Sequence, residues 1–520
     1  MANLGGSNEH AKYVLAIDQG TTSSRAIIFG DDAQVLHVKG YPFEQKYPNP
    51  GWCEQDPYAI LESTIKSVNE VAELIVPYGS ITAVGITNQR ETVIAWDKVT
   101  GKPLYNAIVW LDLRTYDTVK ALTMDGSKDR FRHITGLPIS TYFTALKIRW
   151  LLDNVDEVSD AVKEGRCLFG TVDSWLTYNL TGGHNNGGIH VTDVTNASRY
   201  MLMDLSKLEW CEDICNELGI PIDTLPNIVP SCGHIGTIAE SPSHHGLELH
   251  PSLLNVPITA ILGDQQSALL GHGCVEDGQA KCTYGTGCFM LANTGDKIIQ
   301  SSFGLLTTVA FQREGSPVKY ALEGSIAIAG RAVQWLRDQL GVIESAPEVE
   351  ELASTVPNTA GVTVVPAFSG LFTPHWRPDA RAVIAGMTLG TTKAHICRAV
   401  LEGVALQVVD VVRVMERELE HPLSEFYADG GMTSNNLLMQ MQADFLPKDI
   451  YPAMMAETTA FGAAYAAGLA LDLWKVPLQE LIVNLGGHRK VEPHPAALER
   501  KRAIMRRWND ALQRSLGLEE

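Results

Sequence analysis

The sequence has no long apolar run. None of its 520 residues belongs to an apolar stretch of about 18 or more, so a membrane-spanning helix is not expected. The N-terminal MANLGGSNEHAKY lacks the apolar core of a secretory signal. The most apolar segment, 460–474 (AFGAAYAAGLALDLW), is short and alanine-rich, which predicts a tightly packed helix. These absences favour a cytoplasmic protein that is not an integral membrane protein.

Cysteine is scattered rather than paired. The nine cysteines include no CxxC pair and are odd in number, which fits a reducing compartment better than a disulfide framework. Cys211 and Cys215 lie one helical turn apart, with Cys232 and His234 nearby, and would be the candidates for a zinc site. A second spaced pair of ligands is missing, so we interpret these cysteines as buried thiols.

Basic charge is also scarce. The formal net charge is −19, which argues against the basic face that nucleic acid requires. The pattern G-x-x-x-x-G-K-[ST] does not occur, so a P-loop nucleotide site is excluded. An apolar content of 45% describes a globular chain. The length predicts two or more domains, since a domain usually has about 100–200 residues.

A polar turn stands near the start of the chain. Residues 16–30, AIDQGTTSSRAIIFG, contain Asp18, a glycine and four hydroxyl residues between strand-like runs at 13–17 and 24–30. Glycine lets a phosphate approach the backbone, and Thr or Ser hydroxyls add donors. Asp18 would repel a bare phosphate but suits Mg²⁺ held between the two, and Arg25 supplies a cation for transferred charge. For this motif alone, an ordinary polar hairpin turn is the alternative.

Related signals recur along the chain. Asp56 and Pro57 predict a helix start, because an acidic N-cap is followed by proline. A second glycine–threonine hairpin at 281–295 and a strand, DGG turn and helix at 426–446 suggest that two domains grip one nucleotide. Further expected features are strands at 34–43 and 81–87, surface loops at 181–190 and 240–255, and a domain boundary near 271–274. These elements predict an α/β fold with mixed sheets.

Several motifs together resemble one family. They are DQGTTSSR, GITNQRET, YFTALKIRWLLDN, GTVDSWL, TDVTNASR, GDQQSAL, YGTGCFML, YALEGSIAIAG, DGGMTSNN and ETTAFGAAYAAG. In combination they are similar to the glycerol kinases, within the FGGY family of carbohydrate kinases and the actin-like ATPase superfamily. The family's two signature regions are legible at 142–154 and 382–402. The resemblance implies two actin-like, ribonuclease H-like α/β domains, residues 1–272 and 273–520, with a nucleotide cleft between them.

The implied reaction is the ATP-dependent phosphorylation of glycerol to glycerol 3-phosphate, which feeds glycolysis and lipid synthesis. The implied protein is a cytoplasmic homo-oligomer, with a homodimer favoured. By this resemblance Asp18 and Asp264 hold Mg²⁺, Arg25 lies close to the transferred group, and Asp264 is the general base. The expected nucleotide contacts are Thr21, Thr22, Ser23, Gly285, Thr286, Gly330, Gln334, Gly431 and Asn435.

The resemblance also implies a set of substrate contacts. They are Arg90, Glu91, Trp110, Tyr142, Asp264, Gln265 and Phe289. The residue types suit glycerol, whose three hydroxyls each donate and accept: Arg90 donates, whereas Glu91 and Asp264 accept. Trp110 and Phe289 would cover the C–H edge. Without the resemblance, both aromatic residues would be interpreted as core, and Arg90 with Glu91 as a surface ion pair.

One stretch departs from the family pattern. Similar kinases usually carry Tyr-Trp-Asp before the second signature and a glycine in ARG, whereas His375, Arg377 and Ala382 stand in PHWRPDARAV here. The departure concerns local structure or turnover more than reaction class. Three alternatives stay open: a kinase for another polyol or sugar, an assembly protein that uses ATP as a switch, and a relative that has lost turnover.

The C-terminal segment is basic with an apolar stripe. Ile504, Trp508, Leu512 and Leu516 share one helical face. A membrane-surface or calmodulin-binding helix would show this pattern. We favour a terminal helix that packs its stripe on the second domain.

Overall fold

The computed structural model describes residues 11–124, 128–240, 247–377 and 379–518. Contacts divide the chain into two compact units. Unit 1 comprises Met1–Gly273, Thr308–Tyr320 and Glu457–Leu485, and unit 2 comprises Cys274–Thr307, Ala321–Ala456 and Gly486–Glu520. Because two later segments join unit 1, the continuous domains 1–272 and 273–520 stay a prediction. Residues 241–246 of the loop predicted at 240–255 lie outside the described residues.

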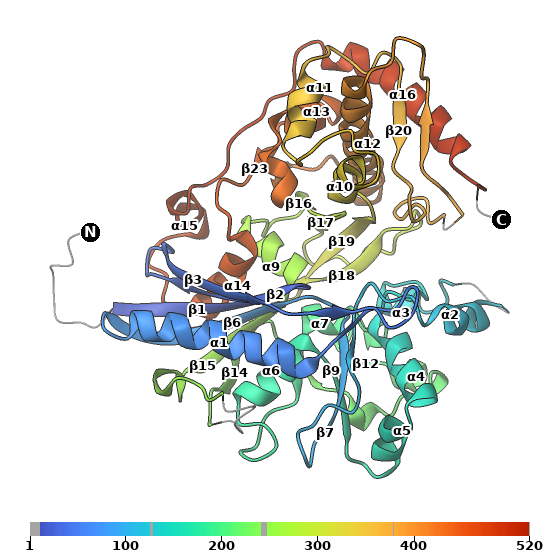
Figure 1. The fold of residues 1–520 in the computed structure, drawn as a ribbon. Helices are drawn as coiled ribbons and strands as arrows, with labels where there is room; N and C mark the ends of the chain where they lie inside the picture. Colours follow the sequence, from blue (N-terminus) through green and yellow to red (C-terminus); the bar gives the residue numbers. More distant parts are fainter. Residues whose placement is uncertain (1–10, 125–127, 241–246, 378, 519–520) are drawn as a thin grey trace. The chain divides into compact units, whose positions relative to one another are not determined.

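A six-stranded mixed sheet forms the centre of unit 1 (Figure 1). Its strands, in spatial order, are β14 (Cys232–Thr237), β15 (Pro257–Gly263), β6 (Gly79–Asn88), β1 (Ala11–Gln19), β2 (Ser23–Phe29) and β3 (Val35–Pro42). The strands β1, β2 and β3 pair antiparallel, whereas β6 is parallel to both β1 and β15. The strands predicted at 13–17, 24–30, 34–43 and 81–87 are therefore confirmed.

The register of this sheet aligns three strand ends. Asn88, the last residue of β6, is opposite Gln19 of β1 on one side and Gly263 of β15 on the other. Ligand sites in α/β sheets form beyond the carboxyl ends of such parallel strands. The segments that follow Gln19, Asn88 and Gly263 therefore emerge side by side at one edge of the sheet.

Helices cover both faces of the sheet (Figure 1). The helix α1 (Pro57–Ile75) packs on β2 and β3, and α14 (Thr458–Ala470) packs on β1, β6 and β15. Asp56 caps α1 as predicted, because its Oδ1 accepts a hydrogen bond from the amide of Tyr58 at 2.9 Å. The alanine-rich run at 460–474 contains most of α14, whose alanines are largely buried.

The rest of unit 1 surrounds a second, five-stranded sheet. Its strands are β4 (Gln45–Lys46), β5 (Glu54–Gln55), β8 (Ala107–Ile108), β7 (Val93–Asp97) and β9 (Cys167–Thr171), and two further pairs are β10 (Val191–Asp193) with β13 (Asn227–Val229) and β11 (Met203–Asp204) with β12 (Glu209–Trp210). The other helices are α2 (Tyr116–Thr123), α3 (Arg132–Thr135), α4 (Thr144–Asn154), α5 (Asp156–Lys163), α6 (Val172–Leu180), α7 (Val194–Ala197), α8 (Glu212–Glu217), α9 (Asp264–Gly271) and α15 (Leu478–Asn484).

Unit 2 repeats the strand order of unit 1. Its sheet runs β18 (Leu306–Phe311), β19 (Lys319–Ile326), β17 (Cys288–Asn293), β16 (Gln279–Tyr284), β22 (Glu425–Asp429) and β23 (Tyr451–Pro452), with β18 and β19 crossing the boundary between units. The hairpin β16–β17 and its neighbour β19 are antiparallel, and β22 and β23 then continue in parallel from β16. The same order occurs in β3-β2-β1-β6-β15. The predicted second hairpin and the α/β fold class are confirmed.

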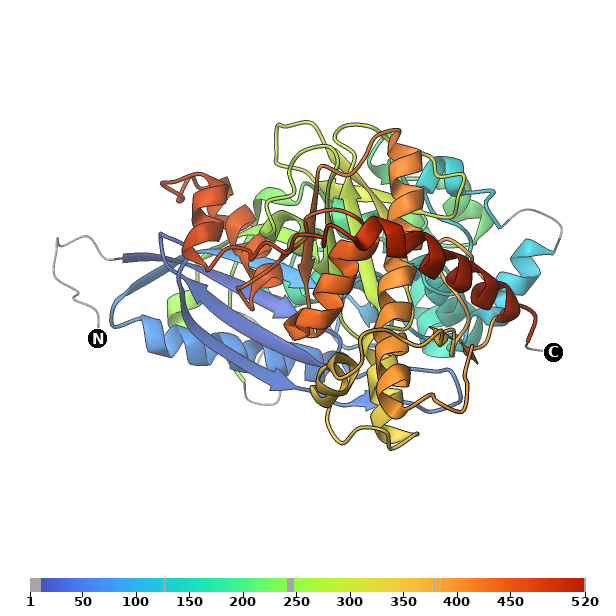
Figure 2. The same cartoon turned by 90° about the horizontal axis from the view of Figure 1, so that it is seen from above.

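A long helix organises the core of unit 2. The helix α12 (Lys393–Leu419) packs against α11 (Glu348–Ser354) and α13 (Asn436–Phe445), and the C-terminal α16 (Ala497–Arg514) lies against α12 and α13 (Figure 2). Trp508 and Leu512 are buried there, and Ile504 and Leu516 pack on the same core. The preferred interpretation of the C-terminal stripe is therefore confirmed. The remaining elements are α10 (Gly330–Asp338), β20 (Thr363–Val365) and β21 (Val383–Ala385).

No helix in the described ranges combines the length and the apolar content of a membrane span.

Two glycines allow α9 and α14 to touch through their backbones. A Cβ added to Gly462 would lie 1.9 Å from the carbonyl oxygen of Ser267, and one on Gly271 would lie 2.1 Å from that of Thr458. Both distances are far below van der Waals contact, and backbone atoms cannot rotate away. This close backbone contact between the two helices holds the start of α14 against α9, the helix that begins with Asp264.

We expect Gly462→Ala to destabilise unit 1. An extra methyl group in such a crossing forces the helices apart, which costs about 1–3 kcal/mol or more. Chemical unfolding of the variant and the wild type measures the loss. Gly390→Ala is the control, because the nearest atom to its added Cβ would be Thr388 Oγ1 at 3.7 Å. Equal losses in both variants would contradict the close crossing.

Asp173 is a buried carboxyl group between a strand and a helix. It lies in the first turn of α6 and accepts hydrogen bonds from Thr171 Oγ1 at 2.5 Å and Thr192 Oγ1 at 2.6 Å. Burial raises the pKa of Asp173 to about 7, and the two hydroxyl groups only partly oppose the rise. The neutral form therefore fits this environment better than the carboxylate.

The raised pKa of Asp173 predicts a pH-dependent stability. The protonated Asp173 contributes fully to the free energy of unfolding below the pKa of the unfolded chain, which is near 4. This contribution is lost as the pH rises through the folded pKa of about 7. Asp173→Asn stays neutral at every pH. Its free energy of unfolding, relative to that of the wild type, should therefore increase between about pH 5 and pH 8. Unfolding free energies at both pH values measure the gain. A wild-type to variant difference that does not change with pH would contradict the assignment.

Candidate active site

The turn between β1 and β2 is fixed from inside unit 1. Its backbone closes through a 2.9 Å hydrogen bond from the Gly20 amide to the Ser23 carbonyl. Gln55 Nε2 donates to the Thr21 carbonyl at 2.7 Å, and Gln89 Nε2 donates to the Gly20 carbonyl at 3.2 Å. Thr21 is half-buried in this turn, whereas the next residue, Thr22, is exposed. The turn thus keeps one shape while it presents hydroxyl groups at the strand ends.

Arg25 lies between two carboxylates. It forms an ion pair with Asp18, its register partner across the hairpin, and its Nη1 lies 2.9 Å from Glu457 Oε2. Burial lowers the pKa of the Arg25 guanidinium, but the two carboxylates together raise it further. Burial also raises the pKa of Glu457, against the effect of Arg25. Glu457 was not among the predicted site residues, although it begins the ETTAFGAAYAAG motif.

Trp110 joins the turn between β1 and β2 to the predicted substrate residues. Its Nε1 donates to Thr21 Oγ1 at 3.0 Å, and its backbone amide donates to Thr92 Oγ1 at 3.1 Å. Its ring meets that of Tyr142 edge to face, with centroids 5.9 Å apart and an interplanar angle of 69°. Trp110 is half-buried, so it is neither a core residue nor a surface residue.

Arg90 and Asp264 form an ion pair at the ends of neighbouring strands. Arg90 Nε lies 3.3 Å from Asp264 Oδ1, and Arg90 Nη1 donates to Gln266 Oε1 at 3.3 Å. The Arg90 side chain is 2% exposed and that of Asp264 is 31% exposed. Asp264 is the first residue of α9, where the positive end of the helix dipole favours a carboxylate. Gln265 follows in the same turn and is half-buried.

Glu91 lies in a strained turn beside Arg90. Its φ is +58°, and the amide of Thr92 donates to the carbonyl of Arg90 at 2.8 Å, which makes a three-residue turn. Left-handed backbone is costly for a residue such as glutamate. The buried Glu91 carboxylate accepts from Arg199 Nε at 2.6 Å. Arg199 belongs to TDVTNASR but was not among the predicted site residues.

A buried lysine supports the backbone of Tyr142. Lys147 Nζ donates to the Tyr142 carbonyl, and its side chain is buried in α4. Burial lowers the pKa of Lys147 to about 8, and the nearby Glu91 carboxylate opposes that change. The sequence signal for this residue was its place in the YFTALKIRWLLDN motif.

The predicted nucleotide residues of unit 2 converge on one hairpin turn. The amide of Gly330 donates to the Gly285 carbonyl at 3.0 Å, and the amide of Ala329 donates to the Thr286 carbonyl at 2.9 Å. Gly430, with φ +91°, packs so closely that a Cβ would lie 2.5 Å from the Tyr284 carbonyl oxygen. The hairpin turn, the start of α10 and the turn before α13 therefore meet.

The other predicted residues of unit 2 lie on these same elements. Gln334 is on α10, where its Oε1 accepts from Arg331 Nη1 at 3.1 Å. Gly431 begins a short 3₁₀ turn, and Asn435 caps α13 by accepting from the Leu438 amide at 2.8 Å. Phe289 is on β17 and is half-buried. Their roles toward a ligand stay predictions.

The stretch that departs from the family pattern is bound within unit 2. Arg377 pairs with Asp379, which holds the pKa of Asp379 down at about 2. Asp379 Oδ2 also accepts from the Gly517 amide at 2.9 Å. His375 Nε2 lies 3.5 Å from Asp410 Oδ2. Arg377 thus has an acidic neighbour in Asp379, and Asp379 in turn binds the backbone at Gly517 near the C-terminus.

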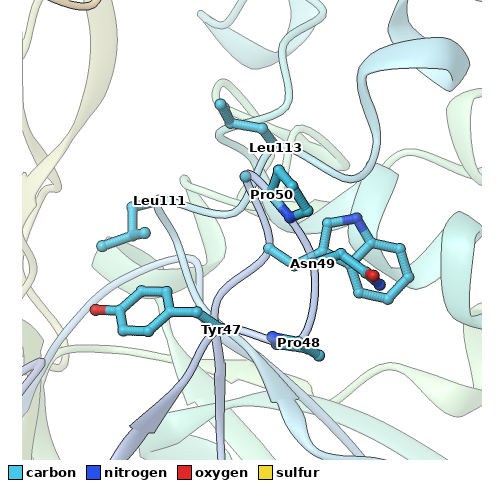
Figure 3. Close-up of a pocket in the computed structure, with 8 residues that line it drawn as sticks. Tyr47, Pro48, Asn49, Pro50, Leu111 and Leu113 are labelled. Carbon is cyan, nitrogen blue, oxygen red and sulfur yellow. The ribbon is translucent and has the colours of Figure 1, made fainter.

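Unit 1 has a surface hollow whose lining includes Leu111, the residue that follows Trp110 (Figure 3). It has a volume of about 550 Å³ and is lined by Tyr47, Pro48, Asn49, Pro50, Gly51, Trp52, Leu111 and Leu113. It has no carboxylate or cation in its wall, so it lacks the groups that phosphoryl transfer requires.

The cysteines are free thiols. Eight are buried, which confirms their interpretation as buried thiols, whereas Cys211 is half-buried. Across the described ranges, no group of three or more His, Cys, Asp or Glu side chains is arranged to hold a metal ion.

Known proteins match this chain over almost its whole length. Models of the FGGY family of carbohydrate kinases match residues 13–271 (N-terminal domain) and 280–471 (C-terminal domain). Glycerol kinase of Acidiphilium cryptum is 50% identical over 506 residues, or 97% of this chain and 99% of its own. Glycerol kinase of Brucella anthropi is 50% identical over 509 residues, with the same two shares.

Solved structures agree with the sequence relatives. The crystal structure of Plasmodium falciparum glycerol kinase with ADP is 38% identical, covers 97% of this chain and 98% of its own, and superposes with a TM-score of 0.89. Gluconate kinase from Lactobacillus acidophilus, with a TM-score of 0.84 at 20% identity, shares the fold. The resemblance found in the sequence is confirmed: the chain belongs to the FGGY family of carbohydrate kinases, and within that family it is similar to the glycerol kinases.

Proposed function

We propose that the protein transfers a phosphoryl group from ATP to glycerol and produces glycerol 3-phosphate and ADP. The observation that carries this proposal is the hydrogen bond from Trp110 Nε1 to Thr21 Oγ1. It joins the predicted polyol residues to the predicted phosphate turn inside one unit. The names of the relatives from A. cryptum and B. anthropi support glycerol as the acceptor, and the ADP of the P. falciparum structure supports the nucleotide.

The polyol contacts follow from the chemistry of the cluster. Glycerol needs both donors and acceptors, and Arg90 supplies the first while Glu91 supplies the second. Both side chains are buried and tied to neighbours, so an analogue that lacks a hydroxyl group would leave one of them unpaired. Trp110, Tyr142 and Phe289 would cover the hydrocarbon edge, and Gln265 would bind a further hydroxyl group.

Asp264 is the proposed general base. A glycerol hydroxyl attacks the γ-phosphorus in line and must lose its proton. The Asp264 side chain is 31% exposed, compared with 9% for Asp18 and 2% for Glu91. It is therefore the most accessible of these three carboxylates, and Arg90 holds it in place.

The proposed nucleotide contacts come from two parts of the chain. In unit 1, Thr21, Thr22 and Ser23 would contact phosphate oxygens and Arg25 would approach the transferred group. In unit 2, Gly285, Thr286, Gly330, Gln334, Gly431 and Asn435 would bind the nucleotide. The open surroundings of Gly285 and Gly431 support this role, because an added Cβ would meet only the Gly287 carbonyl oxygen at 3.8 Å at Gly285 and nothing within 4 Å at Gly431, so a phosphate can approach the main-chain amides there.

Mg²⁺ fits the acidic side of the cluster. Asp18 and Glu457 face a single guanidinium, so this group of three side chains carries a net negative charge and suits a cation. Asp18 would hold the ion, with Asp264 as the second candidate. When bound, Mg²⁺ would neutralise charge on the phosphate oxygens.

A coupled assay of ADP release tests the proposed function. Release should require glycerol and should stay near background with other polyols, with sugars or with no acceptor. Release that does not depend on any polyol would favour the ATP-switch alternative. A preference for another acceptor would reassign the substrate.

The predicted cytoplasmic location and homodimer belong to the same proposal.

Asp264→Asn should lower turnover by about 10²–10⁴-fold, the usual contribution of a general base. Because the amide keeps the shape of the side chain, glycerol should still bind. Turnover falls because the amide cannot take the proton. Asp18→Asn is the comparison, and it should mainly change the Mg²⁺ concentration that gives half-maximal rate. Near-normal turnover of Asp264→Asn at saturating substrates would move the base elsewhere.

Arg90→Met should impair glycerol use and spare ATP binding. The variant keeps an unbranched side chain but loses the guanidinium that faces Asp264 and Gln266. Loss of a charged hydrogen-bond donor usually costs about 1.5–3 kcal/mol, so the KM for glycerol should rise at least tenfold. Steady-state kinetics and equilibrium nucleotide binding measure the two effects. A glycerol KM within about twofold of wild type would remove Arg90 from the substrate site.

A further inference from the structure

Residues 193–199, DVTNASR, form a buried segment of which only Arg199 has been connected to the site so far. The segment contains α7, and every one of its residues is at most 2% exposed. Three of them, Thr195, Asn196 and Arg199, have side chains that bond to Glu91 or to the strand ends that lead to Arg90 and Asp264. We propose that this segment is the positioning framework of the polyol site, with Arg199 and Thr195 as its positioning residues.

Arg199 positions Glu91. Its Nε donates to Glu91 Oε1 at 2.6 Å, and the two side chains are 0% and 2% exposed, so the pair is removed from water. The same guanidinium lies over the ring of Tyr142, with its carbon 5.7 Å from the centroid. Removing one partner of a buried pair leaves the other charge uncompensated. Without Arg199, Glu91 would lose the partner that fixes the orientation of its carboxylate.

Asn196 positions the strand end that leads to Arg90 and Glu91. Its Nδ2 donates to Asn88 Oδ1 at 3.1 Å, and Asn88 Nδ2 donates back to Asn196 Oδ1 at 3.0 Å. Asn88 ends β6, and its Nδ2 also donates to the carbonyl of Gln89 at 2.9 Å. This double amide contact fixes where the strained turn at Glu91 begins.

Thr195 positions the strand end that leads to Asp264. Its Oγ1 accepts from the amide of Gly263 at 2.9 Å and donates to Asp193 Oδ1 at 2.9 Å. Asp193 is held in turn by Ser231 Oγ, which donates to its Oδ2 at 2.7 Å. The backbone just before the proposed base is therefore bound to a buried hydroxyl group that cannot rotate without breaking two hydrogen bonds.

The two contacts meet at one place in the sheet. Asn88 and Gly263 are register partners at the ends of β6 and β15. Segment 193–199 thus binds the ends of both strands and also the side chain of Glu91. A network that satisfies its polar groups in this way sets one geometry, and loss of one member moves the others.

The proposal makes different predictions for its two residues. Arg199→Met should raise the KM for glycerol about 10- to 100-fold and leave the KM for ATP within about twofold, because it removes a charged partner of Glu91. It should also weaken the preference for glycerol over propane-1,2-diol, since recognition of a hydroxyl group is lost. Arg199→Lys should recover part of both. Thr195→Val should mainly lower kcat, by about tenfold, because a small displacement of the base is costly.

Matched controls separate positioning from general destabilisation. Thr181 is a buried threonine in unit 1 whose Oγ1 accepts from the amide of Ile189 at 3.0 Å, so Thr181→Val removes an equivalent hydrogen bond. Arg398 donates from Nη1 to the carbonyls of Ala353 and Val356 in unit 2, so Arg398→Met removes another largely buried guanidinium. Both controls should lower the unfolding temperature and leave the glycerol preference unchanged.

The experiment measures KM, kcat, the preference for glycerol over propane-1,2-diol, and the unfolding temperature with and without glycerol. The inference rests on the proposed function, and a wild type without glycerol-dependent ADP release would overturn that function first. With an active wild type, folded Arg199→Met and Thr195→Val that keep the wild-type KM, kcat and preference would overturn the inference. If Arg199→Met does not fold, Arg199→Lys and Thr195→Val decide it by the same measurements.

Discussion

The candidate site depends on the parallel register of β6 with its two neighbours. Asn88 lies opposite Gln19 of β1 and Gly263 of β15, so three segments leave the sheet at one edge. The first segment is the turn between β1 and β2, the second carries Arg90 and Glu91, and the third begins with Asp264. A shift of one residue in either pairing would turn alternate side chains to the opposite face and separate these groups.

Arginine side chains then set the position of each carboxylate. Arg25 faces Asp18 and Glu457, Arg90 faces Asp264, and Arg199 faces Glu91. The chain has a net charge of −19, so a site for anionic phosphates needs local positive groups. These arginines supply such groups, and the low exposure of Arg90 and Arg199 makes their two pairings stronger than they would be in water.

The sequence predicted the local parts of this arrangement well. The hairpin around Asp18, the cap at Asp56 and the glycine turn near 430 are each encoded within a few residues, so propensity and turn chemistry predict them. Glu457, Arg199 and Thr195 were not predicted as site residues. Their partners Arg25, Glu91 and Gly263 lie 432, 108 and 68 residues away. No local pattern indicates such pairings, because only the assembled sheet brings them together. The return of 308–320 and 457–485 to unit 1 is non-local in the same way.

The backbone at Glu91 has a consequence for how this protein can evolve. A glutamate at φ +58° gives up about 1–3 kcal/mol that a glycine would keep. Selection for heat resistance alone would therefore favour glycine there and would erase the carboxylate that Arg199 holds. Under the proposed function, a glycine at position 91 would relieve the strain and keep the turn but remove the acceptor for the polyol, so stability and recognition oppose each other at this residue.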